Sequence, residues 1–335
     1  MKDLGKNKLI MIACGIVVFV LVIVIVLLLY NSIFAKTSYK DIENKVLYAA
    51  EKYYGEHPEL LPQNENEEVS TTDASLTQAG YLKSMSELTK KMDGVTCTAT
   101  VMVNYAGGEY RYTPLLNCGD AYSTKTLVSH IEANESKVFD GNGLYEYNGE
   151  LVYRGEEPNT YVKLSGKIWR IVKIANGKAV LIADEKVSSV VWDDRFNADR
   201  DDTDGINDYS VSRIKDSLAD LYNDGSIEKS EVFENQYIGL LPLYDYINAS
   251  IDTNCNSANT NTCSNYNYLS LYGYTWWTLT ADASNTYKVF RVATNGTIGL
   301  SRASSNGYLR PVIQLAKDAI YVSGNGTSED PYIIK

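Results

Sequence analysis

Histidine is almost absent from the sequence, and its scarcity narrows the chemistry open to the protein. His57 and His130 are the only two among 335 residues. They lie far apart in the sequence, and neither has a serine, a cysteine or an acid at a spacing typical of a catalytic group. Two isolated imidazoles also leave little material for a zinc site. We therefore expect a binding protein and no enzyme; a glycan-acting enzyme would need two carboxylates set in a cleft.

Basic residues are also in short supply. Lysine and arginine together number 31, against 42 aspartates and glutamates, so the net charge is −11. Proteins that bind nucleic acid depend on basic side chains that contact phosphates, so this balance argues against a nucleic-acid partner. Phenylalanine and tryptophan are scarce, at 6 and 4 residues, whereas tyrosine reaches 27. That bias is typical of recognition surfaces, because tyrosine offers rigid amphipathic contact area.

One long segment lacks charge altogether. Residues 9–35 read LIMIACGIVVFVLVIVIVLLLYNSIFA, with polar side chains only near the end. Since about 20 apolar residues cross the hydrocarbon core of a bilayer, this segment predicts a transmembrane helix that contacts lipid. Lys2, Lys6 and Lys8 precede it and predict a cytoplasmic N-terminus. We therefore expect a single-pass cell-membrane protein whose C-terminal body lies outside the cytoplasm.

The cysteines fit that location. Beyond Cys14, the other four form two local pairs. Counting outward from a turn at Gly107-Gly108 places Cys97 opposite Cys118 at a non-hydrogen-bonded site, where Cα atoms about 4.5 Å apart permit a disulfide. Two reduced core cysteines are the alternative. Cys255 and Cys263 bracket a polar loop without a core of its own, and we expect a second disulfide there.

The spacing of apolar residues predicts the order of helices and strands. Apolar residues recur every three or four positions beyond the charge-free segment, so one helix should run from about Leu9 to Tyr54 and end at Gly55 and Pro58. A short helix over 76–92 and a hairpin over 95–118 should follow, and a later helix over 210–223. Alternation with period two predicts the strands 144–147, 150–154, 160–164, 167–174, 178–183, 275–279, 287–292, 308–315 and 332–334.

The first third of the chain carries one family resemblance. Residues 9–120 combine a long helix pattern, the segments AAEKYYGEHPELLP and LTQAGYL, and a cysteine-bearing hairpin. In this arrangement the chain resembles bacterial type IV pilins and pseudopilins. It departs from them because it lacks their Gly-Phe processing site and the glutamate five residues into the mature helix. The resemblance implies a pilin-like stalk, and a minor structural role in a pilus or secretion apparatus is the alternative function.

The C-terminal half carries a second resemblance. Its motifs are LVYRGEEPNTYVKLSGKIWRIVKI, WDDRFN, GINDYSVSRIKDSLADLY, YTWWTLTADAS, YLRPVIQLA and GNGTSEDPYIIK. In this order they resemble an uncharacterised domain of bacterial surface and secreted proteins that is related to C-type-lectin-like folds. The resemblance implies a lectin-like head that binds an extracellular glycan or protein ligand, as an adhesion module does.

These observations together predict an α+β protein with four parts. They are a cytoplasmic tail (1–8), a transmembrane helix (9–35), a pilin-like extracytoplasmic domain (36–140) and a mainly antiparallel, lectin-like β-rich domain (141–335).

The segment WDDRFNADRDDTDGIND holds seven aspartates, offset only by Arg195 and Arg200. Such a density of carboxylates invites a cation, and oxygen ligands at alternating loop positions suit Ca²⁺. The candidate calcium ligands are Asp199, Asp201, Thr203 and Asp204. The pattern departs from a calcium loop because Asp204 stands where glycine is expected. The alternative is a solvated acidic loop that its arginines partly neutralise. No other cofactor is expected.

The ligand site is predicted on loops of the C-terminal half. Adjacent Trp276 and Trp277 must face opposite sides of a sheet, so either one is exposed as a sugar platform or a second layer buries both. Arg310 lies in an apolar strand and needs a carboxylate or carbonyl partner, and we expect an ion pair. The loops 254–268, 281–287 and 302–308 are rich in Asn, Ser and Tyr. The candidate ligand-binding residues are Tyr266, Tyr268, Trp277, Asn285 and Asn306; the alternative is that these loops are only solvated connections.

Overall fold

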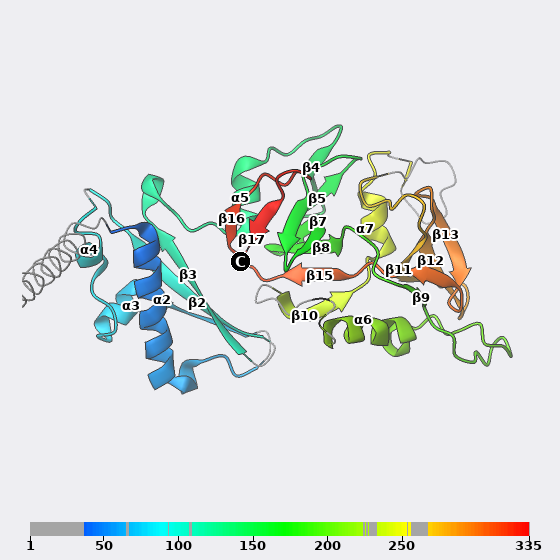
Figure 1. Ribbon diagram of the computed structural model, residues 1–335, viewed down its shortest axis with the longest axis horizontal. Coiled ribbons are helices and arrows are strands. Elements are labelled where there is room, and N and C mark those ends of the chain that lie inside the picture. Colours follow the sequence, from blue (N-terminus) through cyan, green and yellow to red (C-terminus); the bar gives the residue numbers. More distant parts are fainter. Residues whose placement is uncertain are drawn as a thin grey trace, which may run out of the picture. The chain divides into compact units, whose positions relative to one another are not determined.

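The computed structural model describes residues 37–64, 67–92, 94–106, 109–223, 225, 227, 233–252, 254–255 and 267–334. The chain divides into two compact units, and each is built from several segments (Figure 1). Residues up to 56, residues 71–100 and residues 116–123 form the first unit; the remainder forms the second. Neither unit is continuous in sequence.

The main helix of the first unit is α2 (Tyr39–Glu56). Its start is fixed by Ser38, whose Oγ accepts from the Asp41 amide at 3.1 Å while the Asp41 carboxylate accepts from the Ser38 amide at 2.9 Å. Ile42, Val46, Ala49 and Ala50 form its buried stripe. The predicted periodicity is confirmed over these residues. The predicted continuous helix from Leu9 is wrong at Thr37 and Ser38, which are not helical, and α2 continues through Gly55 to end at Glu56, two residues beyond the predicted Tyr54.

Two short helices replace the single helix predicted over 76–92: α3 (Asp73–Gln78) and α4 (Met85–Leu88). Each begins at its own side-chain cap, because the hydroxyl groups of Thr72 and Ser84 accept backbone N–H groups of the following turns. Two caps so close in sequence divide the apolar pattern between two helices.

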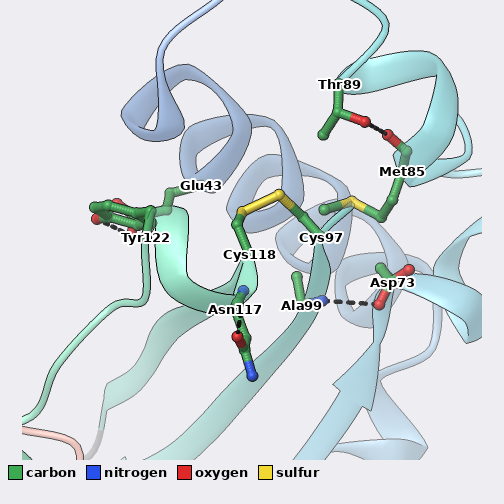
Figure 2. The surroundings of a disulfide bond; sticks show 10 residues. Glu43, Asp73, Met85, Thr89, Cys97, Ala99, Asn117, Cys118 and Tyr122 are labelled. Carbon is green, nitrogen blue, oxygen red and sulfur yellow. Dashed lines mark hydrogen bonds between the residues drawn. A yellow bond between two sulfur atoms is a disulfide. The ribbon is translucent and has the colours of Figure 1, made fainter. Parts of the chain in front are cut away.

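A three-stranded sheet has the order β1-β2-β3, and its first strand precedes these helices in the chain. Its strands are β1 (Glu68–Thr72), β2 (Thr98–Ala106) and β3 (Glu109–Asn117). The predicted hairpin is therefore present, and the predicted disulfide between Cys97 and Cys118 closes it with 4.1 Å between the Cα atoms. Beside the disulfide, the Tyr122 hydroxyl donates to the Glu43 carboxylate at 2.8 Å (Figure 2).

The larger sheet of the second unit has nine strands. They are β4 (Gly143–Tyr147), β5 (Glu150–Arg154), β6 (Tyr161–Leu164), β7 (Lys167–Ala175), β8 (Lys178–Ala183), β10 (Phe233–Gly239), β15 (Val312–Leu315), β16 (Tyr321–Ser323) and β17 (Tyr332–Ile334). Their order is β10-β15-β8-β7-β6-β17-β16, and the β4–β5 hairpin is attached through β7 (Figure 1). Asn148 and Gly149 both have positive φ, at 52° and 80°, as the predicted type I′ turn requires.

A smaller sheet of five strands, in the order β13-β12-β11-β14-β9, completes the second unit. Its strands are β9 (Ser189–Val191), β11 (Trp276–Ala281), β12 (Lys288–Val292), β13 (Ile298–Arg302) and β14 (Asn306–Tyr308). The α-helices of this unit are α5 (Leu127–Asn134), α6 (Arg213–Asn223) and α7 (Leu243–Asn248). The single strand predicted over 308–315 is wrong, because Arg310-Pro311 divides it into β14 of this sheet and β15 of the larger one.

The predicted fold class is wrong. Within the described residues no helix combines the length and the apolar character needed to cross a membrane, and this finding also contradicts the predicted single-pass localisation. The predicted span over 9–35, with its bilayer contact, lies outside those residues. Both sheets of the second unit are mixed, since β17 runs parallel to β6 and β11 parallel to β14, although their other strand pairings are antiparallel as predicted. Parallel neighbours are joined by long crossovers, which alternation in the sequence does not reveal.

The tryptophans occupy two separate cores of the second unit. Trp169 and Trp276 belong to the main core, whereas Trp192 and Trp277 belong to a smaller core that includes α6. All four side chains are buried, so the two faces of β11 are both covered. Of the two predicted arrangements for the adjacent tryptophans, burial of both is the one observed.

Candidate functional site

A cleft of about 420 Å³ lies where β7 begins and β8 ends. This volume falls within the range of ordinary ligand pockets, which is roughly 300–1,000 Å³. The residues that line it are Gly166, Lys167, Ile168, Trp169, Ala183, Asp184, Glu185, Lys186, Val187, Ile227 and Pro311. They all belong to the second unit.

The ladder between β7 and β8 places the two rims of this cleft. Trp169 pairs with Ala183, and the ladder extends one step further because the Asp184 amide donates to the Ile168 carbonyl at 3.1 Å. Beyond that point the chain leaves β7, and the Val187 amide donates to the Leu309 carbonyl at 2.9 Å. This divergence at the end of the ladder opens the space between the two segments.

The floor of the cleft is apolar. Trp169 and Ile227 are almost fully buried, and Ala183 is 9% exposed. Val187 is 43% exposed and offers an open aliphatic surface at the edge. Burial of apolar ligand surface against this floor is favourable by roughly 25 cal/mol per Å².

Charged side chains surround the mouth of the cleft. Lys167 and Glu185 are both exposed, and neither forms an ion pair with the described part of the chain. Asp184 is different, because Arg170 Nη1 lies 3.6 Å from its carboxylate. Lys186 is held over the Tyr274 ring, with Nζ 3.8 Å from the ring centroid. Lys167 and Glu185 are therefore the charges available to a ligand.

The buried Arg310 side chain supports one rim of the cleft through hydrogen bonds to backbone carbonyls. Its guanidinium donates to the Ala183 carbonyl at 2.9 and 3.0 Å, to the Leu269 carbonyl at 2.5 Å and to the Asp184 carbonyl at 3.4 Å. Burial lowers the pKa of Arg310 to about 10. The predicted ion pair is therefore wrong, because backbone carbonyls and not a carboxylate accept the hydrogen bonds of Arg310. The sequence indicated Arg310 because an arginine beside a proline is unusual in an apolar strand. No sequence pattern indicated that this residue supports the cleft.

A second hollow, of about 320 Å³, lies between α5 and the β4–β5 hairpin and is mainly acidic. Glu135 accepts hydrogen bonds from the Tyr153 hydroxyl at 2.8 Å and the Tyr332 hydroxyl at 2.6 Å. Burial raises the pKa of Glu135 although both hydrogen bonds act to lower it. Glu146 is paired with Lys137 at 2.5 Å. These carboxylates are used within the fold, so this hollow is the weaker candidate.

The predicted calcium ligands do not converge on one point. Asp204 is buried and accepts from Arg200 Nε at 3.2 Å and from Arg302 Nη1 at 2.9 Å, whereas Asp199, Asp201 and Thr203 are exposed. Among the described residues there is no group of three or more His, Cys, Asp or Glu that could hold a metal ion. The calcium site stays a prediction.

Arginines neutralise the same acidic loop at its start. The Asp193 carboxylate is buried and lies 2.6 Å from Arg195 Nη2. Burial raises the pKa of Asp193, but the hydrogen bonds from Arg195 and from the Ile206 amide outweigh it, and the pKa is lowered overall. These contacts agree with the alternative of an acidic loop partly neutralised by its arginines.

The five residues predicted to bind ligand are dispersed. The Tyr268 hydroxyl is buried and donates to the Ile171 carbonyl at 2.8 Å. Trp277 is fully buried and donates to the Val190 carbonyl at 3.1 Å. Asn285 forms a turn by accepting from the Lys288 amide at 2.7 Å.

Asn306 is exposed on β14, and Tyr266 lies outside the described residues. No residue of the predicted set that the structure describes lines the cleft. Cys255 is disulfide-bonded, whereas Cys263, its predicted partner, is also outside the described residues.

No family model, no curated protein and no solved structure matches the chain. The resemblances to pilins and to lectin-like domains therefore stay predictions. The site has to be interpreted from its own geometry.

Proposed function

We propose that the protein is a binding module for a glycan or protein ligand, and that the cleft at the ends of β7 and β8 is its ligand site. One observation carries the proposal: an apolar floor is bordered by Lys167 and Glu185, two exposed and opposite charges that do not pair with described residues. A ligand in such a site gains burial from the floor and orientation from the charges.

The chemistry of the lining favours binding over catalysis. Covalent catalysis needs a nucleophile beside a base, and the cleft-lining residues that the structure describes include no serine, cysteine or histidine. Asp184 forms an ion pair with Arg170, so Asp184 and Glu185 are not arranged as the general acid and base of a glycosidase. The rim is held in place from beneath by Arg310, which suits a preformed binding site.

The test is a binding screen of the full oxidised chain against an oligosaccharide array and a peptide array. Val187→Trp should fill the edge of the cleft with an indole ring, and Val211→Trp is the matched control at another exposed valine, 52% exposed against 43%. We expect ligands whose binding falls by at least about 10-fold in the first variant and is unchanged in the second. Ligands that bind equally to both variants would contradict the cleft as the site.

A further inference from the structure

We infer that the cleft takes an extended peptide segment in which an apolar side chain stands between an acidic and a basic residue. This inference rests on the proposed function and identifies the ligand class of the same site. It is carried by the composition of the floor, by the position of the two charges and by the absence of a stacking surface among the described lining residues.

The floor suits an aliphatic or aromatic side chain. Its described apolar members are Ile168, Trp169, Ala183, Val187, Ile227 and Pro311. Val187 is exposed and Ile168 is half-buried, whereas the other four, including Trp169 with its indole N–H, are buried. The surface that the floor offers is therefore aliphatic, and the part of the ligand that enters must itself be apolar. A neutral sugar ring carries hydroxyl groups around its edge, and these would lose hydrogen bonds to water against such a floor.

The cleft also lacks the exposed aromatic face on which a sugar ring stacks. Trp169 is the one aromatic residue among the described lining residues, and it is 1% exposed. The nearby ring of Tyr274 is 38% exposed but lies outside the lining, and Lys186 occupies one of its faces, with Nζ 3.8 Å from the centroid. The geometry therefore favours a peptide over a neutral glycan.

The two charges lie on opposite rims of the floor. The observed register pairs Trp169 with Ala183, and the Asp184 amide continues the ladder to Ile168. Lys167 precedes Ile168 on β7 and Glu185 follows Asp184, so the two charges stand on the two segments that diverge from the end of this ladder. Both line the cleft together with Trp169 and Ala183.

A peptide complements this arrangement when its acid reaches Lys167 and its base reaches Glu185. Each exposed ion pair contributes little by itself, but a reversed pair of charges would oppose the ligand at both rims. Charge order along the peptide should therefore matter more than the identity of the apolar residue.

The experiment uses an array of terminally blocked peptides with a central Leu, Ile or Phe, one Asp and one Lys on opposite sides at varied spacing, and both charge orders. Neutral peptides with Asn and Gln in place of the charges, and neutral oligosaccharides, are the rival probes. The proteins are the full oxidised chain, the double variant Lys167→Glu/Glu185→Lys, which preserves net charge, and the control Lys163→Glu. Lys163 is exposed on β6 and does not line the cleft.

We expect the unaltered chain to prefer one charge order and the double variant to prefer the other, with a change in relative affinity of about 10-fold at low salt. The preference should weaken as ionic strength rises. Lys163→Glu should keep the original preference.

Three results would overturn the inference, and they separate it from the proposed function. Binding of oligosaccharides or neutral peptides that Val187→Trp abolishes but the charge exchange leaves intact would refute the charged peptide as the ligand and retain the cleft. An identical charge-order preference in the unaltered chain and the double variant would do the same. Failure of every probe to bind, or binding unaffected by Val187→Trp, would refute both.

Discussion

Removing the disulfide of the first unit should have a large and calculable effect. Cys97 and Cys118 are 21 residues apart and both are buried. Closing a loop of this length removes about 11 cal/mol/K of chain entropy from the unfolded state, which corresponds to about 3.4 kcal/mol at 25 °C. The double variant Cys97→Ala/Cys118→Ala should lose about that much free energy of unfolding in the first unit.

Hydrogen exchange is the suitable assay because the four tryptophans, Trp169, Trp192, Trp276 and Trp277, all belong to the second unit, so their fluorescence does not report on α2. Amides of α2 that exchange through unfolding of the unit should exchange faster by roughly two to three orders of magnitude. Chemical reduction is a poorer perturbation, since Cys255 is also disulfide-bonded.

The single variants provide the control. Either Cys97→Ala or Cys118→Ala removes the whole cross-link, so each should lose nearly the same free energy as the double variant, and the losses should not add. An acceleration in α2 below about 10-fold would refute the loop-closure argument for this unit.

Three further predictions concern the second unit. Asp318→Ala deprives the Arg111 guanidinium, 2.6 Å from a fully buried carboxylate, of its partner, and urea unfolding followed by tryptophan fluorescence should lose about 3–5 kcal/mol. Arg310→Lys cannot span the Ala183 and Leu269 carbonyls, so it should destabilise by at least about 2 kcal/mol and weaken ligand binding in the cleft. Burial raises the pKa of Glu135 above its usual 4.5, so wild-type stability should fall as pH rises from 4.5 through that raised pKa; Glu135→Gln should flatten this slope in urea titrations.

Each of these predictions has a contrary result. A loss below about 1 kcal/mol for Asp318→Ala would mean that the Arg111 pair is not isolated from water. Unchanged stability in Arg310→Lys would mean that the carbonyls find other donors. If the free energy of unfolding of the Glu135→Gln variant and of the wild type changed equally with pH, groups other than Glu135 would cause that change.

Local rules predicted the hairpins well. Counting from Gly107-Gly108 was enough to pair Cys97 with Cys118, and the dipeptide Asn148-Gly149 was enough to give the turn between β4 and β5. Both depend only on strand alternation near a tight turn. Such regularity is available in the sequence because nothing distant has to be known.

Counting outward from a turn does not give the register at the cleft, because a β-bulge interrupts the ladder between β7 and β8. Counting outward from the turn at Asn176-Gly177 would pair Lys167 with Lys186. A bulge between Ile171 and Lys173 shifts the register by one residue, so the ladder ends with Trp169 opposite Ala183 and not opposite Asp184. No residue type in this stretch predicts the bulge, so counting from the turn misplaces the residues at the end of the ladder.

The sheet architecture was missed for a different reason. Residues 308–315 look like one apolar strand, but their two ends, β14 and β15, pair in separate sheets on either side of Arg310-Pro311. The parallel neighbours β6 and β17 come from segments far apart in the sequence. Pairings of this kind are decided by packing across the whole unit and not by the local pattern.

Hydrogen exchange of the full oxidised chain with its tightest-binding array probe tests the central claim most directly. The account predicts slower exchange, on ligand addition, in the two segments that border the cleft, residues 166–169 and 183–187. Protection confined to other parts of the second unit, with those two segments unchanged, would contradict it.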